Sequence, residues 1–209
     1  MEITKYGHSC LRVVDGSANI LIDPGAFSAG FEDLTGLTAV LVTHQHPDHL
    51  DRDRLPAVLA ANPGVSVYAD EATAGQLGEA GIGASAVHSG GDLDVGTPVQ
   101  VVGRDHAIIH ADIPVVPNVG YLIGGRLLHP GDSLAVPEQD VEILAVPASA
   151  PWMAIKEAVE FFRAVNPAVA FPIHEKVIAN PAMAYGLLSR LGPTGARWID
   201  LDDGHTEEL

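Results

Sequence analysis

Short runs of alternating apolar residues open the chain and predict an antiparallel sheet. The runs cover Ile3–Tyr6, Cys10–Val14 and Asn19–Ile22, and Asp15, Gly16 and Ser17 provide turn residues between the last two. The continuous apolar run Ala39–Thr43 follows and is typical of a strand buried on both faces. This predicted strand ends directly at a cluster of histidines.

Helices and further strands alternate after this point. The predicted helices cover Arg54–Ala61 and Glu71–Ala80, on either side of the strand Val65–Tyr68. The segment Ala84–His129 returns to β structure, with its clearest strands at Val99–Val102, Val119–Ile123 and Arg126–His129. The last third repeats the order strand, helix, strand, helix, strand, over Glu142–Val146, Met153–Val165, Ala168–Ile173, Pro181–Leu191 and Arg197–Leu201.

These two halves, each a sheet with helices, predict an α/β fold. Apolar sheet faces must be buried, so the simplest arrangement is a four-layer αββα sandwich with the two sheets facing each other and helices on both outer sides. No low-complexity segment or linker interrupts the chain. We therefore expect a single domain over residues 1–209.

Composition and charge narrow the function classes. Of the 209 residues, 47% are hydrophobic and 18% are charged, as in compact globular proteins. The 27 acidic residues against 11 basic ones give a formal net charge of −16, which would repel the phosphate backbone of a nucleic acid. We therefore expect no nucleic-acid partner.

Cysteine content and hydropathy bear on the compartment. The single cysteine, Cys10, excludes an intramolecular disulfide and a cysteine-based zinc site. Met1–Tyr6 shows no basic segment followed by an apolar one, and no stretch approaches the ~20 apolar residues that cross a bilayer. We expect a cytoplasmic protein with no membrane partner.

The highest density of potential metal ligands lies in the segment Thr43–His49, directly after the buried strand. Its sequence, Thr-His-Gln-His-Pro-Asp-His, places three imidazoles and one carboxylate close together. On an extended segment His44 and His46 share one face, whereas Asp48 and His49 follow a proline and can turn elsewhere. Imidazole and carboxylate ligands suit zinc, iron or manganese. A polar surface loop is the alternative, but this density of potential ligands favours a metal site.

Together with its strand, this motif resembles the signature of the metallo-β-lactamase superfamily. Later segments match that superfamily's motifs in order and lie at the ends of predicted strands: Gly103–His106, His129–Ser133 and Phe171–His174. The resemblance extends from about Tyr6 to His174 and implies the αββα fold of the metallo-β-lactamase type. It is nearest to the small UlaG-like branch of L-ascorbate-6-phosphate lactonase-like hydrolases, which Tyr6–Ser9 and Ile22–Gly25 support.

The resemblance implies a pair of divalent metal ions, zinc by default, with manganese and iron able to use the same ligands. Carried over residue by residue, three histidines would hold the first ion, three residues the second, and one aspartate would bridge both. In that order the ligands are His44, His46 and His106, then Asp48, His49 and His174, then Asp132. Asp48 and Asp132 are the expected catalytic carboxylates.

Two histidines compete for the third position at the first ion. We favour His106 over His110, because His106 closely follows the strand Val99–Val102 and the other expected ligands also lie at strand ends. His110 would then line the pocket or support a ligand.

Other residues are candidates for substrate contact or for support of the ligands: His8, Asp23, His129 and Trp152. The Gly-His-Ser sequence around His8 lies near the metals in the UlaG-like branch, although a buried core histidine is an equal alternative. Asp23 could accept an N–H from a ligating imidazole or cap a turn. Trp152 could line the pocket, but covering the edge of the core is the favoured interpretation. We interpret Glu175 as a surface charge.

The expected function follows from this ligand set. A metal-bound hydroxide would cleave a small-molecule ester, lactone or phosphodiester, with Asp132 orienting the nucleophile. A small molecule is thus the expected partner, and homo-oligomerisation is left open. The alternative is a non-hydrolytic protein of the same fold, either an iron-dependent redox protein or a metal-binding protein without turnover, but the complete ligand set favours the hydrolase.

Overall fold

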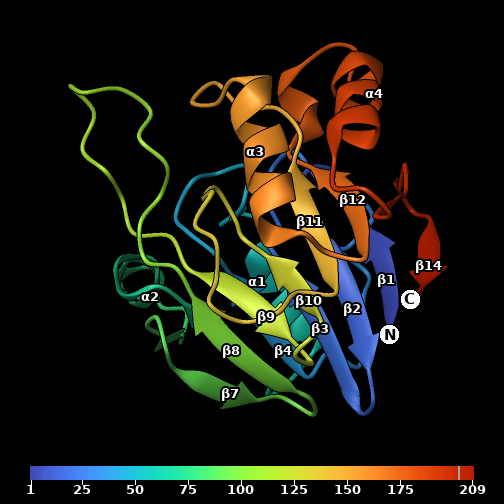
Figure 1. Ribbon diagram of the computed structural model, residues 1–209. Coiled ribbons are helices and arrows are strands. Elements are labelled where there is room, and N and C mark those ends of the chain that lie inside the picture. The colour runs from blue at the N-terminus through green and yellow to red at the C-terminus, as the bar shows by residue number, and fades with distance from the viewer. Residues whose placement is uncertain (202) are drawn as a thin grey trace.

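The computed structural model describes residues 1–201 and 203–209, and within them the chain forms two facing sheets (Figure 1). The first sheet has the strand order β14-β1-β2-β3-β4-β5-β6. Its strands in chain order are β1 (Glu2–Lys5), β2 (Leu11–Asp15), β3 (Ala18–Ile22), β4 (Ala39–Val42), β5 (Ser66–Ala69), β6 (Ser85–Ala86) and β14 (Thr206–Glu208).

The second sheet has the order β13-β12-β11-β10-β9-β8-β7. Its strands are β7 (Asp92–Asp94), β8 (Pro98–Val102), β9 (Gly120–Ile123), β10 (Leu127–His129), β11 (Ile143–Pro147), β12 (Val169–Ile173) and β13 (Arg197–Trp198). Each sheet is antiparallel on one side and parallel on the other, because β3 to β6 and β10 to β13 are parallel.

Helices cover the outer faces of both sheets. They are α1 (Leu55–Ala61) and α2 (Glu71–Glu79) in the first half, and α3 (Ile155–Val165), η1 (Glu175–Val177) and α4 (Ala182–Leu191) in the second. Figure 1 shows α3 and α4 on one side of the molecule and α1 behind the sheets. The structure thus confirms the four-layer αββα sandwich. None of the helices in the described part of the chain is long and apolar enough to cross a membrane.

The core between the sheets is built from the alternating apolar residues of the strands. Ile20 and Leu41 of the first sheet belong to the same fully buried cluster as Tyr121 and Phe171 of the second. The hydroxyl of Tyr121 donates to the carbonyl of Val42, at 2.9 Å, so its buried polar atom is satisfied across the two sheets. This contact ties the sheets together directly beneath the end of β4.

Capping residues set both ends of α3, which begins two residues later than the sequence predicted. Ala154 is extended, and its backbone N–H donates to the carboxylate of Glu157, at 2.7 Å, which closes the first turn. Asn166 ends the helix in the left-handed region with φ of 51°, and a proline follows. The apolar face of α3 packs on the second sheet through Phe161 and Phe162.

Short edge strands were missed by the hydropathy pattern. β14 pairs antiparallel with β1, and the amine of Met1 donates to the carbonyl of Leu209, at 2.9 Å, so N- and C-terminal segments lie side by side (Figure 1). The predicted strand Arg197–Leu201 is only Arg197–Trp198. Edge strands have few buried positions, so their sequences show little alternation.

Helix α2 offers a direct test of its local energetics. Gly78 is exposed within the helix, and an added Cβ would have no heavy atom within 4 Å. We expect Gly78→Ala to raise the free energy of unfolding by about 0.5–1 kcal/mol, because alanine restricts the unfolded chain and favours the helix. Urea unfolding measures this. Gly96→Ala is the opposite control. Gly96 has a φ of +99°, and an added Cβ would lie 2.9 Å from the nitrogen of Ala18, so this variant should be less stable. A Gly78→Ala variant that is no more stable than the wild type would contradict this explanation of helix stability.

Candidate metal centre

The candidate ligands gather at one end of the two sheets because the strands that carry them end there. β8, β10 and β12 point the same way in the second sheet, and β4 ends opposite them in the first. The segment after β4 supplies His44 to His49, while the segments after β8, β10 and β12 supply His106, Asp132 and His174. Parallel strands bring their carboxyl ends to a common edge, where ligand sites are usual.

Four of these residues form a first group whose ligand atoms all lie within 4.8 Å of one another: His44, His46, His106 and Asp132. His44 Nε2 lies 3.0 Å from His46 Nδ1. His106 Nε2 lies 3.2 Å from Asp132 Oδ2. Three of the four side chains are buried and His46 is half-buried. This set matches the one that the superfamily resemblance implies for the first ion.

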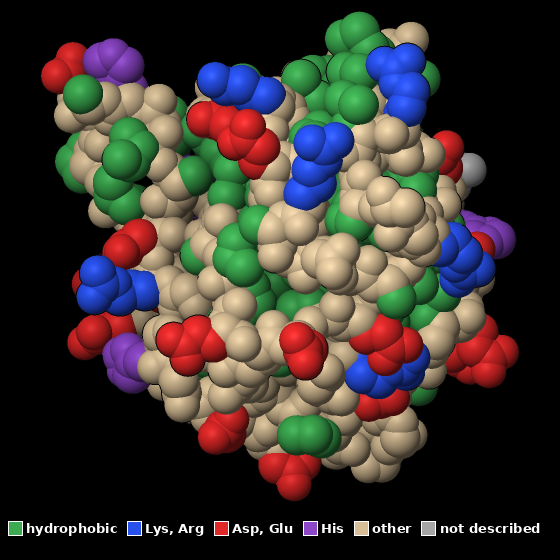
Figure 2. Space-filling view, in the orientation of Figure 1, with side chains coloured by type: hydrophobic (Ala, Val, Ile, Leu, Met, Phe, Trp, Pro, Cys, Tyr) green, Lys and Arg blue, Asp and Glu red, His purple; other side chains and the backbone are tan. Residues whose placement is uncertain are grey.

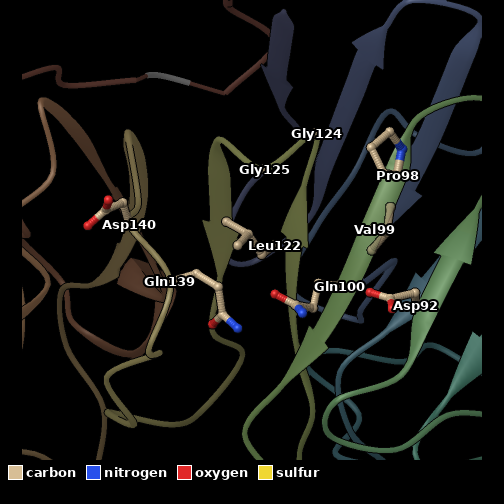
Figure 3. Close-up of a pocket in the computed structure, with 9 residues that line it drawn as sticks. All are labelled: Asp92, Pro98, Val99, Gln100, Leu122, Gly124, Gly125, Gln139 and Asp140. Carbon is tan, nitrogen blue, oxygen red and sulfur yellow. The ribbon is translucent and has the colours of Figure 1, made fainter.

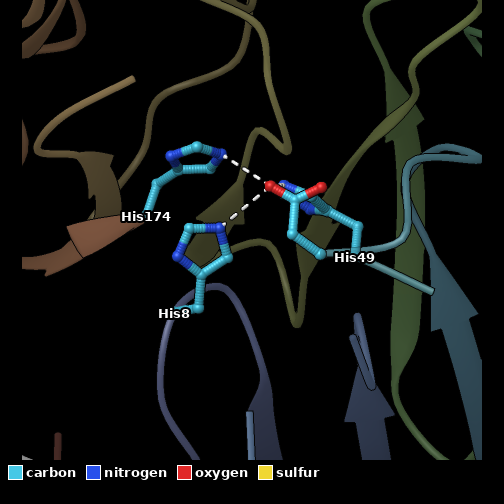
Figure 4. A group of neighbouring side chains, drawn as sticks. His8, His49 and His174 are labelled. Atoms are coloured by element: carbon cyan, nitrogen blue, oxygen red, sulfur yellow. Dashed lines mark hydrogen bonds and ion pairs between the residues drawn. The ribbon is translucent and has the colours of Figure 1, made fainter. Parts of the chain in front are cut away.

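A second group with the same spacing comprises His8, Asp48, His49 and His174. His8 Nε2 and His174 Nε2 lie 3.2 and 3.5 Å from Asp48 Oδ2. Figure 4 shows the rings of His8 and His174 turned towards the same carboxylate oxygen. Asp132 lies between the groups, since its Oδ1 is 3.0 Å from His49 Nε2 and its Oδ2 is 3.2 Å from His174 Nε2. Asp132 is thus placed to contact ions in both groups.

The outer nitrogens of the imidazoles are held by acceptors, which orients the inner ones. His49 Nδ1 lies 2.7 Å from Asp23 Oδ2, and His174 Nδ1 lies 2.7 Å from the carbonyl of Ser149. Asp23 is itself fixed by the backbone N–H and the hydroxyl of Thr43, both at 2.8 Å. An acceptor at Nδ1 keeps the proton there and leaves the lone pair of Nε2 free for a cation.

The polar atoms at the centre fit divalent cations. Among the described residues, four buried ligand atoms have no hydrogen-bond partner, namely His49 Nε2, His106 Nε2, His174 Nε2 and Asp132 Oδ1. Buried polar atoms are nearly always hydrogen-bonded, so a group of them facing one another needs an explanation. Neutral imidazole and carboxylate are the donors that zinc, manganese and iron bind.

The charges of the metal-free side chains compensate one another. Burial by itself would lower the pKa of His174, but the carboxylates of Asp132 and Asp48 close to its Nε2 outweigh burial and raise that pKa to about 9. Burial would likewise lower the pKa of His49, yet Asp132 and Asp23 raise it well above its usual value. Asp132 has the reverse balance, since burial is opposed by the charge of His49 and its pKa falls well below the usual value. The imidazoles of His49 and His174 therefore balance the negative charge of Asp132.

His8 differs from the other histidines in its hydrogen bonds. The backbone N–H of Lys176 donates to His8 Nδ1, at 3.3 Å, so the proton of a neutral His8 ring resides on Nε2. That Nε2–H faces Asp48 Oδ2 at 3.2 Å. His8 therefore acts in this geometry as a donor to a ligand rather than as a ligand. Its φ of 52° is a left-handed conformation rare for histidine, and the His8 backbone N–H is held by Glu175 Oε1 at 3.0 Å.

The other residues singled out from the sequence lie at different distances from the centre. Trp152 donates its indole N–H to Asp132 Oδ2, at 3.0 Å. His129 is fully buried and its Nε2 faces the carbonyl of Ser9, at 2.8 Å. His110 is exposed on the segment between β8 and β9, beside Asp112, and belongs to neither ligand group, whereas His106 of the same segment does. The expectation that His110 lines the pocket or supports a ligand was wrong, because the exposed ring is not among the residues that line the cavity over the cluster.

The interpretation of Glu175 as a surface charge was wrong. Glu175 is buried, and its carboxylate lies 2.8 Å from the ammonium of Lys5, which is only 1% exposed. The sequence carried no signal for this pair, because the two residues are far apart in the chain and each would be soluble on the surface. The pair also holds the backbone of His8 in place, since Glu175 accepts a hydrogen bond from the His8 backbone N–H.

Two close backbone approaches shape the loops that carry the ligands. A Cβ on Gly25 would lie 1.8 Å from the carbonyl oxygen of Asp48, so only glycine permits this contact. A Cβ on Gly131 would lie 2.4 Å from Asn118 Oδ1, and that oxygen accepts the backbone N–H of Asp132 at 2.9 Å. These glycines fix Asp48 and Asp132 in place.

Several cavities in the described part of the chain are of a size for small molecules, and two of them differ in their lining residues. One, of about 430 Å³, lies beside β8 and β9 and is lined by backbone and by side chains such as Gln100, Leu122 and Asp140 (Figure 3). The other, of about 370 Å³, has His46, Asp48 and Asp132 among its lining residues. The smaller of these two cavities is the candidate active site, because candidate ligands line it.

Comparison with known proteins gives concordant matches. A family model described as "Beta-lactamase superfamily domain" matches residues 2–174. The Mycobacterium tuberculosis protein Rv0786c is 50% identical over 202 residues, covering 93% of this chain and 94% of that protein. The UPF0173 metal-dependent hydrolase MJ1163 of Methanocaldococcus jannaschii is 27% identical over 190 residues, covering 82% and 83%. The solved metallo-beta-lactamase fold protein YhfI of Bacillus subtilis matches with a TM-score of 0.76 at 15% identity, covering 99% and 98%.

The buried pair of Lys5 and Glu175 can be tested by stability. We expect Lys5→Met to lower the free energy of unfolding by about 3–5 kcal/mol, because it leaves a buried carboxylate without its cation. The double variant Lys5→Met with Glu175→Gln should recover most of this loss, since glutamine is neutral and can still accept the His8 N–H. Urea unfolding of metal-free protein compares the variants. Equal instability of the single and double variants would show that the charge pairing is not the cause.

Metal binding should release protons. With a pKa of about 9, His174 is protonated at neutral pH in the metal-free protein, and a cation can bind only the neutral ring. The raised pKa stabilises the metal-free protein below about pH 6.5, and this contribution is lost as pH rises through about 9. Zinc affinity should therefore increase with pH up to about 9.

Calorimetry in buffers of different ionisation enthalpy measures the protons released on zinc binding. His174→Gln should release fewer protons than the wild type at neutral pH. Proton release that is unchanged in His174→Gln, or zinc affinity that does not depend on pH, would contradict the assignment.

Proposed function

Because the chain is a metal-dependent hydrolase of the beta-lactamase superfamily, we propose that it cleaves a small-molecule ester, lactone or phosphodiester at a centre holding two divalent cations. The observation that carries this proposal is the arrangement of Asp132 between two groups of ligand atoms, with buried imidazole nitrogens on both sides that lack hydrogen-bond partners among the described residues. A polar core would satisfy such atoms internally.

In this proposal each ion has three ligands of its own, and the two ions share Asp132 as a fourth. His44, His46 and His106 would hold the first ion, and Asp48, His49 and His174 would hold the second. Asp132 would serve both, because its Oδ2 faces His106 of the first group and its carboxylate also lies close to His49 and His174 of the second. Zinc is the metal we propose, since the set is rich in imidazole, although manganese and iron bind the same donors.

Bound divalent cations supply an acidified water as nucleophile and polarise the substrate oxygen. The chain's own residues orient the reactants. Asp132 is ionised, so its carboxylate can accept a hydrogen bond from the attacking water, and the indole N–H of Trp152 holds the same carboxylate in place. Asp48 is also ionised and borders the cavity, where it can accept a proton or a hydrogen bond.

His8 completes the polar side of the second group. Its Nε2–H is directed at Asp48, so it neutralises part of the carboxylate charge without taking a coordination position. His8 thereby orients the Asp48 carboxylate by a hydrogen bond, as residues behind metal ligands commonly do.

Elemental analysis of purified protein tests the centre. We expect about two ions per wild-type chain after zinc or manganese is supplied, falling towards one or none in Asp132→Ala and His106→Ala. His110→Ala is the matched control, because this histidine lies on the same segment as His106 but is exposed and outside both ligand groups. Hydrolysis of a panel of lactones and phosphodiesters should fall about 100-fold or more with the loss of ligands.

The variant His8→Leu separates a donor from a ligand. It should keep the full metal content and lose activity, because leucine can fill the buried position but has no group that donates to Asp48. Wild-type protein that stays metal-free after zinc or manganese is supplied would overturn the proposed function, and a single iron per chain would favour redox chemistry instead.

A further inference from the structure

The cavity over the candidate ligands has a polar floor and apolar walls. The floor is made of ligand side chains, and the walls are Phe27, Pro47, Ile109, Pro151, Trp152 and Val177. We propose that the substrate carries an apolar alkyl or aryl group beside the bond that is cleaved, and no second anionic group such as a phosphate. This inference rests on the proposed function, because it concerns the substrate of that same centre.

The walls come from separate segments whose apolar side chains converge on one opening. Phe27 follows β3 and is 49% exposed, Ile109 lies between β8 and β9 and is 37% exposed, and Val177 ends η1 and is 37% exposed. Single apolar residues on a surface need no explanation, but their gathering around a polar centre is typical of a binding site. A bound apolar group would cover these side chains and remove them from water.

Trp152 gives the wall a fixed surface. Its indole N–H is held by Asp132 at 3.0 Å, and its ring lies edge-on to His106 and His174, with centroid distances of 5.7 and 6.3 Å. The ring is therefore positioned before any ligand arrives. A preformed aromatic wall lowers the entropic cost of binding an apolar group.

The charges around the opening disfavour an anionic substituent. No lysine or arginine is among the residues that line this cavity in the described part of the chain. Three cations on segments that neighbour the cavity are already paired: Lys176 Nζ lies 2.5 Å from Asp203, Lys5 is buried against Glu175, and Arg54 contacts Asp51 at 2.7 Å. A phosphate away from the reacting group would find no charged donor, although phosphate sites usually provide one.

The segment between β8 and β9 adds a matched comparison. It projects from the body of the molecule at the upper left of Figure 1, and Figure 2 shows hydrophobic side chains gathered on the same lobe. Ile109 lines the cavity, whereas its neighbour Ile108 is 68% exposed and does not. The two isoleucines therefore separate the effect of the cavity wall from that of the segment.

Hydroxamic acids, which bind metal ions through one common group, test the walls by binding rather than by turnover. We expect zinc-loaded protein to bind octanohydroxamate at least about 10-fold more tightly than acetohydroxamate, because burial of several methylene groups favours the longer chain. Phosphonoacetohydroxamate should bind no more tightly than acetohydroxamate. Isothermal titration calorimetry gives all three affinities.

Variants of the wall localise the effect. Ile109→Ser and Phe27→Ser should each reduce the preference for octanohydroxamate about 5-fold while leaving acetohydroxamate binding unchanged. Ile108→Ser should change neither affinity. All three positions are exposed, so serine there should be tolerated by the fold.

The outcomes separate this inference from the function on which it rests. Equal affinity for all three hydroxamates, or tightest binding of the phosphonate, would overturn the apolar substrate while leaving the metal centre intact. An equal loss in Ile108→Ser and Ile109→Ser would also overturn it. Protein that takes up no zinc and binds no hydroxamate would overturn the proposed function and, with it, this inference.

Discussion

A single buried carboxylate, that of Asp132, is the constraint on which the rest of the site depends. It lies within 3.2 Å of imidazole nitrogens of His49, His106 and His174, which arrive from both sheets. A buried negative charge is costly unless positive charge surrounds it closely. The sheets must therefore present their ends to one another in a fixed register, which Tyr121 maintains through its hydrogen bond to Val42 at the end of β4.

Much of the fold and the composition of the cluster could be predicted from sequence, because the relevant patterns are local. Alternation and continuous apolar runs identified most central strands, and the layer order followed from the need to bury their faces. The density of potential ligands in the segment Thr43–His49 was enough by itself to predict a metal site. The more distant His106 and His174 needed the superfamily resemblance, which the family-model match over residues 2–174 confirms.

Pairings between distant segments could not be predicted, since neither partner differs locally from a surface residue. Lys5 and Glu175 each look soluble, and only the tertiary structure shows that they are buried against each other. The edge strand β14 likewise owes its structure to β1 rather than to its own polar sequence. From the sequence, the edge of the core was the favoured place for Trp152, but this residue lines the cavity, and its hydrogen bond to Asp132 was not foreseen.

The hydrogen bond of Trp152 gives the protein an optical property. An indole whose N–H is held by a carboxylate changes its fluorescence when that carboxylate is drawn towards another charge. The other tryptophan, Trp198, lies on β13 and faces the helices, packed against Phe162 of α3 with ring centroids 5.8 Å apart. The intrinsic emission of Trp152 can therefore report the occupancy of the centre in unlabelled protein, with Trp198 as a steady background.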